Sequence, residues 1–240
     1  DHIQSMTGEE AFNWLGSEYT SNASVEGLEN IPKDGKFLIV SNHPMGAADA
    51  IALYYKIYPV RNDLFFFANE LFVYLLGAFH ELLAPVVWNK EKETHSANKV
   101  TLERLSVFFG DDRPGIIFPS GRLSKLTFLG LWDRPWEKTP IALAKKYNFP
   151  LIPVYVEGRN SWFFYFASYV NKQLRDISQL NELFNKREKK MSIKIGKPVN
   201  VSTLNDNTDI AIGQMRYRSE SLRKKSVLKL NRFLYLRNFK

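Results

Sequence analysis

Residues 37–49 read FLIVSNHPMGAAD, and this stretch decides the fold. The apolar run from Phe37 to Val40 is long enough for a short buried strand, and the polar residues after it end the run. Pro44 cannot continue a strand, and Gly46 gives the backbone the freedom for a tight reversal. Residues 47–57 then have the pattern of a helix. The stretch therefore predicts a strand, a sharp turn that carries His43, and a helix.

Short apolar segments alternate with helical patterns along the rest of the chain. Further strands are predicted at residues 64–68, 84–88, 115–118, 151–156 and 191–195. Helices are predicted after a capping-box pattern at Thr7–Glu10 and at residues 70–79, 96–109, 139–147 (capped by Thr139), 173–187 and 208–225. The strands are apolar throughout rather than alternating, which is typical of a sheet buried on both faces. The sequence predicts an α/β fold, a single domain over residues 1–240 with a largely parallel central sheet flanked by helices.

The charge of the chain is concentrated near its C-terminus. The 240 residues have a formal net charge of +8, and residues 216–240 alone hold nine Lys and Arg and a single Glu. Apolar residues recur there at helical spacing: Val227, Leu230, Phe233 and Leu234. A basic amphipathic segment is typical of a membrane-surface element, and a solvated helix packed on the domain is the alternative. No nucleic-acid motif accompanies the charge, so we expect no nucleic-acid partner.

The sequence offers no apolar run that would span a bilayer. The nearest candidate, residues 64–88, is interrupted by polar and charged residues. Together with the basic tail at 216–240, this predicts a peripheral or monotopic protein, whose core at about residues 25–201 carries the motif blocks described below.

His43 is the first candidate for chemistry, with Asp49 as its partner. In a regular helix a six-residue offset is a rotation of about 240°, so these two side chains would diverge. They meet only if His43 lies in the turn and Asp49 in the first turn of the helix. A carboxylate on one imidazole nitrogen would then leave the other nitrogen free as a general base. A purely structural His–Asp pair is the alternative.

Several chemistries lack their residues. The chain has no cysteine, so it has no thiol nucleophile and no thiolate metal site. It has no G-x-S-x-G elbow, because Ser120 lacks the first glycine, and no phosphate-binding glycine loop. The other histidines, His2, His80 and His95, do not have metal-ligand spacing, so we expect no metal. If His43 is catalytic, the nucleophile is the hydroxyl or amine of the substrate.

Four blocks of sequence, in order, carry a resemblance to a known family. The segment SNHPMGAAD resembles the first motif of the glycerolipid acyltransferases, in the longer N-H-P-x-G-x-x-D form of their hemolysin-like branch. That branch includes lyso-ornithine and lyso-glycine lipid O-acyltransferases. Residues 117–122 resemble the F-P-x-G block, 153–161 the V-P-V block with its G-R-N-S extension, and 193–198 the closing I-x-I-G-x-P strand. Asp133 and Trp136 sit between the blocks much as in these relatives.

The resemblance implies a fold like that of the glycerol-phosphate acyltransferases and an acyl transfer. A fatty acyl group would move from acyl-carrier protein or acyl-CoA to the hydroxyl of a lysolipid, with no other cofactor, at the cytoplasmic face of a bacterial inner membrane. His43 would deprotonate the hydroxyl, Asp49 would orient His43, and no acyl-enzyme would form. Backbone N–H groups around Ser120 and Gly121 would stabilise the oxyanion. A non-catalytic lipid-binding protein at the membrane surface and an acyl thioesterase are the alternatives.

The same blocks imply the residues that bind substrate. These are Asn42, Asn89, Lys90, Pro119, Ser120, Gly121, Arg122, Arg159 and Asn160. The chain departs from the family at Ser120, where a glutamate is common, and at Asn89-Lys90, where an Asp/Asn-Arg pair handles the acceptor phosphate. Lysine keeps the charge but loses the bidentate fork of arginine, which favours an amino-acid lipid acceptor over lysophosphatidic acid. For Lys90 and Arg159, surface salt bridging is the alternative.

Residues 162–166, WFFYF, directly follow the G-R-N-S extension. Five consecutive aromatic side chains cannot all face inward on a helix or a strand. We expect some of them to form an exposed apolar patch beside the site, where a lysolipid would enter from the bilayer. A buried helix with a few aromatic residues at its rim is the alternative.

Overall fold

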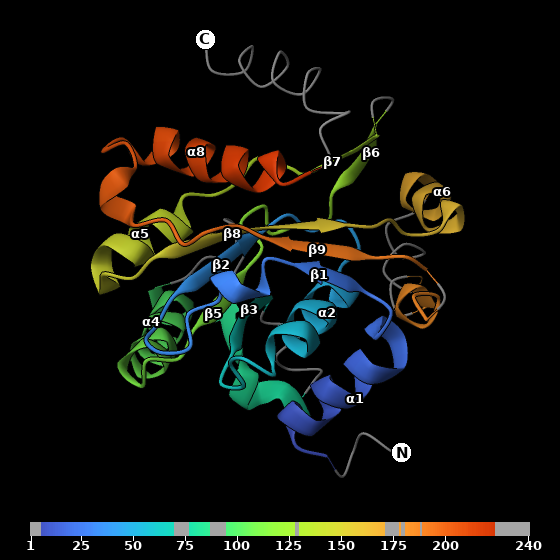
Figure 1. Cartoon of the computed structure of the whole chain (residues 1–240), viewed down its shortest axis with the longest axis horizontal. Helices are drawn as coiled ribbons and strands as arrows, with labels where there is room; N and C mark the ends of the chain where they lie inside the picture. The colour runs from blue at the N-terminus through green and yellow to red at the C-terminus, as the bar shows by residue number, and fades with distance from the viewer. Residues whose placement is uncertain are drawn as a thin grey trace.

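The computed structural model of the chain describes residues 6–69, 77–86, 95–127, 130–170, 178, 181–187 and 189–223 (Figure 1). Within these residues, no helix is both long enough and apolar enough to cross a bilayer.

A seven-stranded sheet forms the centre of the described part of the chain, in the order β1-β9-β8-β2-β5-β3-β4. Its strands are β1 (Ser24–Glu26), β2 (Leu38–Ser41), β3 (Phe65–Asn69), β4 (Leu83–Val86), β5 (Gly115–Ile117), β8 (Leu151–Glu157) and β9 (Ser192–Ile195). Five neighbouring strands, from β8 to β4, run parallel, while β9 pairs antiparallel with β8 and β1 follows β9 in parallel. The expected α/β fold with a largely parallel sheet is confirmed.

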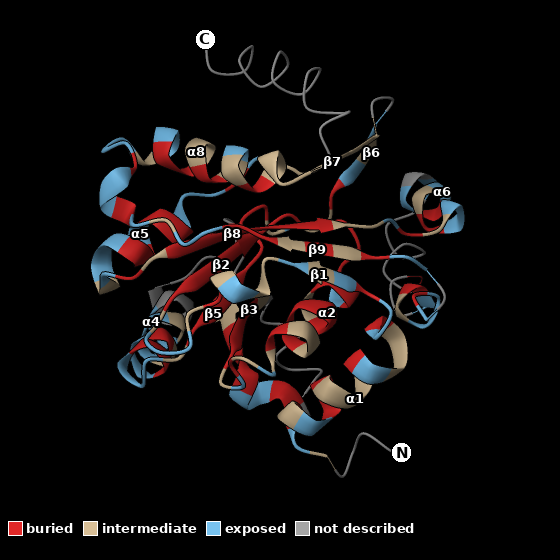
Figure 2. Cartoon of the chain, viewed as in Figure 1, coloured by how far each residue is buried: buried red, intermediate tan, exposed pale blue. Residues whose placement is uncertain are grey.

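Helices cover both faces of this sheet (Figure 1). On one face lie α1 (Gly8–Thr20) and α2 (Ala47–Ile57), and on the other lie α4 (His95–Gly110), α5 (Thr139–Tyr147) and α8 (Thr208–Ser221). Successive residues of β2 serve the two layers in turn, because Ile39 packs in the first core and Leu38 and Val40 pack in the second. This double burial explains why the strand is apolar throughout (Figure 2).

Local sequence signals predicted the start of one helix correctly and that of another incorrectly. The capping box predicted at the start of α1 is present, with Thr7 and Glu10 each bonding the backbone N–H of the other. The prediction that Thr139 caps α5 is wrong, because the N-cap is Lys138 and makes no side-chain cap bond. Thr139 lies within the first turn, where Pro140 also lies and needs no N–H partner.

Some predicted elements differ from the structure or lie outside its described residues. The helix expected at 70–79 is described only from residue 77, where a 3-10 helix, η3 (Gly77–Leu82), is found. Of the helix expected at 173–187, only 178 and 181–184 are described as helical. Helix α8 ends at Ser221, and residues 224–240, with most of the predicted basic tail, lie outside the described part.

Five elements in the described part of the chain were not predicted from the sequence. They are the short edge strand β1, the 3-10 helices η2 (Leu28–Asn30) and η5 (Val201–Thr203), and the strands β6 (Lys125–Thr127) and β7 (Gly130–Trp132) of an antiparallel hairpin. At residues 162–166 a helix was only the alternative, and the structure has the helix α6 (Trp162–Val170) there. The hairpin contributes Leu131 and Trp132 to the pocket described below, and α6 follows the turn after β8, whose Gly158 also lines that pocket (Figure 1).

Candidate active site

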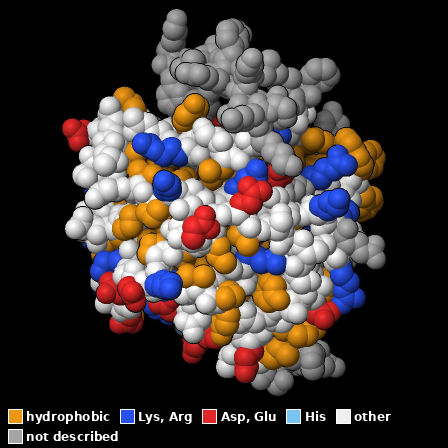
Figure 3. Space-filling model, viewed as in Figure 1, with side chains coloured by type: hydrophobic (Ala, Val, Ile, Leu, Met, Phe, Trp, Pro, Cys, Tyr) orange, Lys and Arg blue, Asp and Glu red, His pale blue; other side chains and the backbone are white. Residues whose placement is uncertain are grey.

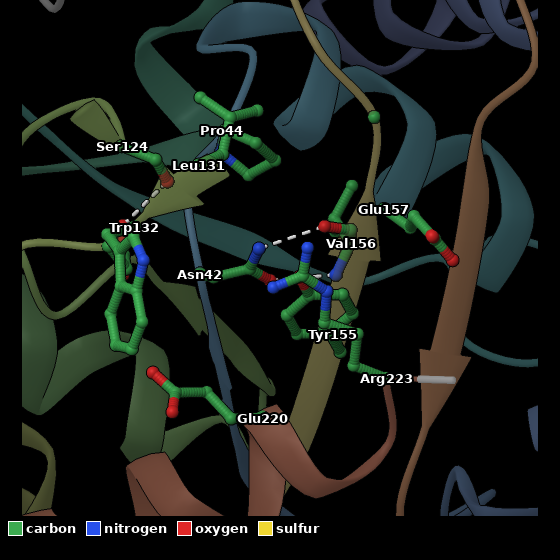
Figure 4. Close-up of a pocket in the computed structure, with 12 residues that line it drawn as sticks. Asn42, Pro44, Ser124, Leu131, Trp132, Tyr155, Val156, Glu157, Glu220 and Arg223 are labelled. Atoms are coloured by element: carbon green, nitrogen blue, oxygen red, sulfur yellow. Dashed lines mark hydrogen bonds between the residues drawn. The ribbon is translucent and has the colours of Figure 1, made fainter. Parts of the chain in front are cut away.

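The candidate site begins at the carboxyl end of β2, where a parallel α/β sheet usually places its ligand. Asn42 fixes the turn that follows, because its amide both accepts from Val156 N (2.7 Å) and donates to Val156 O (2.8 Å) on β8. Figure 4 shows this pairing between the two neighbouring strands. The Asn42 side chain thus extends the β2–β8 ladder and sets the place from which His43 starts.

His43 and Asp49 meet as the sequence predicts for a turn followed by a helix. His43 Nδ1 lies 3.0 Å from Asp49 Oδ2, the His43 side chain is 19% exposed, and that of Asp49 is fully buried. The His43 ring stacks on Phe118, with centroids 3.9 Å apart. Nδ1 therefore faces the carboxylate, while Nε2 is the nitrogen left for a substrate.

Asp49 lies in the first turn of α2, and backbone N–H groups at the start of this helix hold its carboxylate. Its Oδ2 accepts from the backbone N–H groups of Met45 (2.8 Å) and Gly46 (3.0 Å) at the N-terminus of α2. Gly46 has φ 79 and ψ −131, a conformation that residues with a side chain rarely adopt. The helix dipole and these two donors stabilise a negative charge next to the imidazole.

The F-P-S-G turn after β5 lies against this pair through Phe118. Ser120 is buried, and its Oγ donates to the carbonyl of Arg122 at 2.8 Å, while the Gly121 N–H donates to Phe118 O. Gly121 has a positive φ of 59, as a tight turn requires. Because the Gly121 N–H is already bonded within the turn, the Ser120 N–H is the remaining candidate of the two for an oxyanion donor. Arg122 is exposed at the surface of the turn.

A second carboxylate, Asp133, holds the backbone of His43. Its Oδ1 accepts from Ser124 Oγ at 2.9 Å and, at 3.4 Å, from the His43 N–H and from Ser120 Oγ. Its Oδ2 accepts from Trp136 Nε1 at 2.6 Å. Burial raises the pKa of the Asp133 carboxyl, although these hydrogen bonds oppose the shift. Because Ser124 N also donates to His43 O, the histidine backbone is held on both sides.

A pocket opens beside Asn42 and Pro44 (Figure 4). Its walls come from the turn after β2, from β8, from the β6–β7 hairpin and from the end of α8, and its charged lining residues are Asp133, Glu157, Glu220 and Arg223. Glu220 accepts from Arg216 Nε at 2.9 Å, and burial raises the pKa of its carboxyl. His43 does not line this pocket. The pocket therefore adjoins the His43 turn through Asn42 and Pro44, the residues on either side of His43.

The G-R-N-S turn after β8 is built differently. Asn160 is 3% exposed, and its Oδ1 accepts from Lys186 Nζ at 2.8 Å. Lys186 Nζ also donates to the carbonyl of Arg159 (3.0 Å) and to Glu182 Oε2 (3.2 Å). Glu182 in turn accepts from the N–H and the hydroxyl of Ser161. The buried Lys186–Glu182 pair thus holds the whole turn, and of its two predicted binding residues only Arg159 is exposed.

The predicted site residues do not all gather in one place. The structure brings together His43, Asp49, Asn42 and the F-P-S-G turn, where Pro119 is also buried. Asn89 and Lys90 lie outside the described residues. In the described part of the chain, no three His, Asp or Glu side chains come together as metal ligands would.

Sequence reasoning missed several residues around the site as functional candidates. These are Ser124, Trp132, Tyr155, Glu182, Lys186, Glu220 and Arg223. Asp133 and Trp136 had a signal, because both lie between two motif blocks, but no pattern in the sequence predicts that Asp133 accepts from the His43 N–H or that Trp136 donates to Asp133. Arg223 and Glu220 read as part of a basic tail, and only the packing of α8 on β8 brings them to the pocket.

This arrangement is suited to removing a proton from a substrate that the enzyme does not hold covalently. The described site has an imidazole with one nitrogen against a buried carboxylate and the other available, and it has no serine hydroxyl bonded to that imidazole. A His–Asp pair without a serine nucleophile is suited to general-base catalysis rather than to the acyl-enzyme chemistry of a serine hydrolase.

Comparison with known proteins identifies the class of enzyme to which this chain belongs. Residues 10–234 match the protein family described as Acyltransferase, and the chain belongs to this family. The chain is similar to two proteins named lyso-glycine lipid O-acyltransferase, from Phocaeicola vulgatus and Bacteroides thetaiotaomicron, with 32% identity over 186 residues in each case. These matches cover 75% of this chain but 64% and 66% of the two relatives, slightly less than two thirds of their length.

A solved structure has the same fold. It is the 1-acyl-sn-glycerophosphate acyltransferase PlsC from Thermotoga maritima, with a TM-score of 0.53 over 93% of this chain and 76% of that one. At 22% sequence identity, this likeness supports the fold alone.

Proposed function

We propose that this protein is a lysolipid O-acyltransferase that uses His43 as its general base. The observation that carries the proposal is the 3.0 Å approach of His43 Nδ1 to Asp49 Oδ2, which leaves Nε2 for the acceptor. Family membership and the two lyso-glycine lipid O-acyltransferases support the same reaction class. Asp49 is then a positioning residue, which fixes the imidazole tautomer and stabilises the imidazolium.

In the proposed reaction, Nε2 takes the proton of the acceptor hydroxyl, and the oxygen attacks the thioester carbonyl of acyl-carrier protein or acyl-CoA. The new C–O ester bond forms, the C–S bond breaks, and the leaving thiolate takes the proton back from the imidazolium. The Ser120 N–H is our candidate donor to the oxyanion. No acyl-enzyme is required, because the acceptor attacks the donor directly.

For the acceptor, we propose an amino-acid lipid that presents a free hydroxyl at the cytoplasmic surface of the membrane, where both thioester donors are made. The names of the two relatives support this class of acceptor. Arg122 is our candidate contact for the acidic headgroup, because it is exposed on the turn that packs against His43 through Phe118.

The test is thiol release from acyl-CoA and acyl-carrier protein with a panel of acceptors. The panel contains lyso-glycine lipid, lyso-ornithine lipid, lysophosphatidic acid and no acceptor, each with the wild type and with His43→Ala. Release that needs one lysolipid and His43 supports the proposal and identifies the headgroup. Release without acceptor would instead indicate a thioesterase, and lipid binding with no release would indicate a binding protein.

A further inference from the structure

Helix α6 presents an apolar face to the outside of the molecule. Trp162, Phe163, Phe166 and Val170 are between 58% and 69% exposed. At about 100° per residue these four side chains fall within an arc of about 100°. Outside this arc, at about 140° and 200°, Ala167 and Phe164 are 3% exposed and pack into the protein.

This face is unusual for a surface in contact with water. A surface helix normally has polar residues outside and apolar residues inside, whereas Trp162–Val170 reads WFFYFASYV and contains no charged residue. Figure 3 shows hydrophobic side chains gathered at the upper right edge, where Figure 1 places α6, with Lys or Arg side chains beside them. A contiguous exposed apolar patch of this kind marks a docking surface.

The α6 face is connected to the candidate site by a rigid turn. Gly158 lines the pocket, and α6 begins four residues later at Trp162. A Cβ at Gly158 would come within 2.5 Å of the Met45 side chain, so this turn lies against the turn that carries His43. The Lys186–Glu182 pair and Asn160 then fix the path between them. Whatever α6 contacts is therefore held at a set position relative to the pocket.

A cation lies at the start of the patch. The Arg159 guanidinium is 5.8 Å from the centroid of the Trp162 ring, and Arg159 is exposed. An aromatic side chain next to a basic one is suited to the interface of a bilayer, where the ring lies among the acyl chains and the cation meets a phosphate.

We propose that the α6 face, composed of Trp162, Phe163, Phe166 and Val170, inserts into the interface of an anionic bilayer and holds the pocket at headgroup depth. This inference rests on the proposed function in that the acceptor is a lipid. A second copy of the chain is a poorer occupant. Four side chains offer on the order of 500 Å² of apolar surface, short of the ~800 Å² per partner that a stable complex buries.

The experiment is vesicle flotation of the full-length protein, with vesicles of phosphatidylethanolamine and phosphatidylglycerol. The variant is Trp162→Gln, Phe163→Gln and Phe166→Gln combined, which leaves the buried face of α6 intact. The matched control replaces three similarly exposed apolar side chains of α4, as Val100→Gln, Leu102→Gln and Val107→Gln combined. Binding is measured at low and at high salt, because salt screens a basic tail but not apolar insertion.

We expect the α6 variant to lose about a thousandfold in vesicle affinity at high salt, about tenfold for each of the three aromatic side chains. The α4 control should bind as the wild type does. The inference is overturned if the α6 variant floats like the wild type at high salt. It is also overturned if the wild type does not bind vesicles and is a dimer that the α6 variant separates into monomers.

The same preparations separate this inference from the proposed function. Vesicle binding is measured without donor, and His43→Ala should float like the wild type. Thiol release with a short-chain acceptor that is soluble without vesicles should be the same for the α6 variant and the wild type. Loss of release with intact flotation would contradict only the catalytic proposal, and the reverse would contradict only the docking proposal.

Discussion

The turn after β2 and the turn after β8 lie side by side, but they use their polar groups in opposite ways. Because β2 and β8 are parallel neighbours, both turns project from the same edge of the sheet. In the first turn, His43 has one nitrogen against Asp49 and a ring that is 19% exposed. In the second, Asn160, Ser161, Glu182 and Lys186 bond one another and are buried or partly buried.

The difference shows that a sequence block does not define a role by itself. Both turns carry blocks that resemble the family motifs, yet the first keeps a partly exposed imidazole, whereas in the second Ser161, Glu182 and Lys186 are bonded to one another. A buried charge without a partner costs several kcal/mol. Lys186 and Glu182 therefore each need the charge of the other to remain buried.

The largest expected effect is that of His43→Ala. We expect kcat/KM for acyl transfer to fall about 10³–10⁴-fold, because the general base is lost. The fold should survive, since the ring is partly exposed and contacts one face of Phe118. Thiol-release kinetics and a thermal melt measure the two quantities. Wild-type turnover in His43→Ala would show that His43 is not the general base.

Glu182→Gln should lower the stability of the fold rather than the turnover of the folded protein. We expect a loss of about 3–5 kcal/mol in the free energy of unfolding at neutral pH, because Lys186 is left buried without its counter-charge. Denaturant titration measures this loss, and the folded fraction should keep near-normal turnover. A variant as stable as the wild type would show that the pair does not hold the turn.

The pH dependence of that stability has a defined sign. Burial alone would raise the pKa of Glu182, but the hydrogen bonds from Ser161 and the charge of Lys186 bring it below its ordinary value of 4.5. A lowered carboxyl pKa stabilises the fold above the unfolded value, and that contribution is lost as the pH falls through the folded value. The stability gap between wild type and Glu182→Gln should therefore narrow below pH 4.5.

Asp49→Asn should lower kcat about a hundredfold with little change in KM, because the imidazolium loses its counter-charge. An asparagine oxygen still accepts from the two N–H groups that begin α2, so the helix should remain capped. Steady-state kinetics with the acceptor varied test this split. Asp34→Asn, at an exposed turn, is the control. An equal loss in both variants would point to a general charge effect.

The smallest effect distinguishes the exposed arginines of the two turns. We expect Arg122→Gln to raise KM for the acceptor about tenfold at constant kcat, with partial recovery in Arg122→Lys. Arg159→Gln should leave KM for a soluble acceptor within about twofold, because its guanidinium lies over Trp162 on the α6 face. The opposite pattern, measured by steady-state kinetics, would assign the headgroup contact to Arg159 and the second turn.

Much of this fold is encoded in local sequence patterns. The apolar run at 37–40, the turn with Pro44 and Gly46, and the helical pattern after it predicted both β2–α2 and the meeting of His43 with Asp49. That prediction succeeded because the three signals are adjacent and each has one backbone solution. The start of α5 was missed by one residue, because proline fits at either of the first two helical positions.

The contacts that sequence patterns did not predict join segments that are distant along the chain. Asp133 reaches the backbone of His43 across 90 residues, and Glu220 and Arg223 reach the pocket only because α8 packs on β8. The G-R-N-S block does not predict that Asn160 Oδ1 accepts from Lys186, 26 residues later. No periodicity or spacing within a motif encodes such long-range pairings.

The most direct test of the account is a single-turnover measurement of thiol release with and without the lysolipid acceptor. If His43 activates the acceptor hydroxyl for direct attack, wild-type enzyme mixed with donor alone releases no thiol and keeps its unmodified mass. Addition of acceptor then gives release that His43→Ala abolishes. A burst of thiol equal to the enzyme concentration before acceptor is added, with an acylated protein mass, would contradict the account.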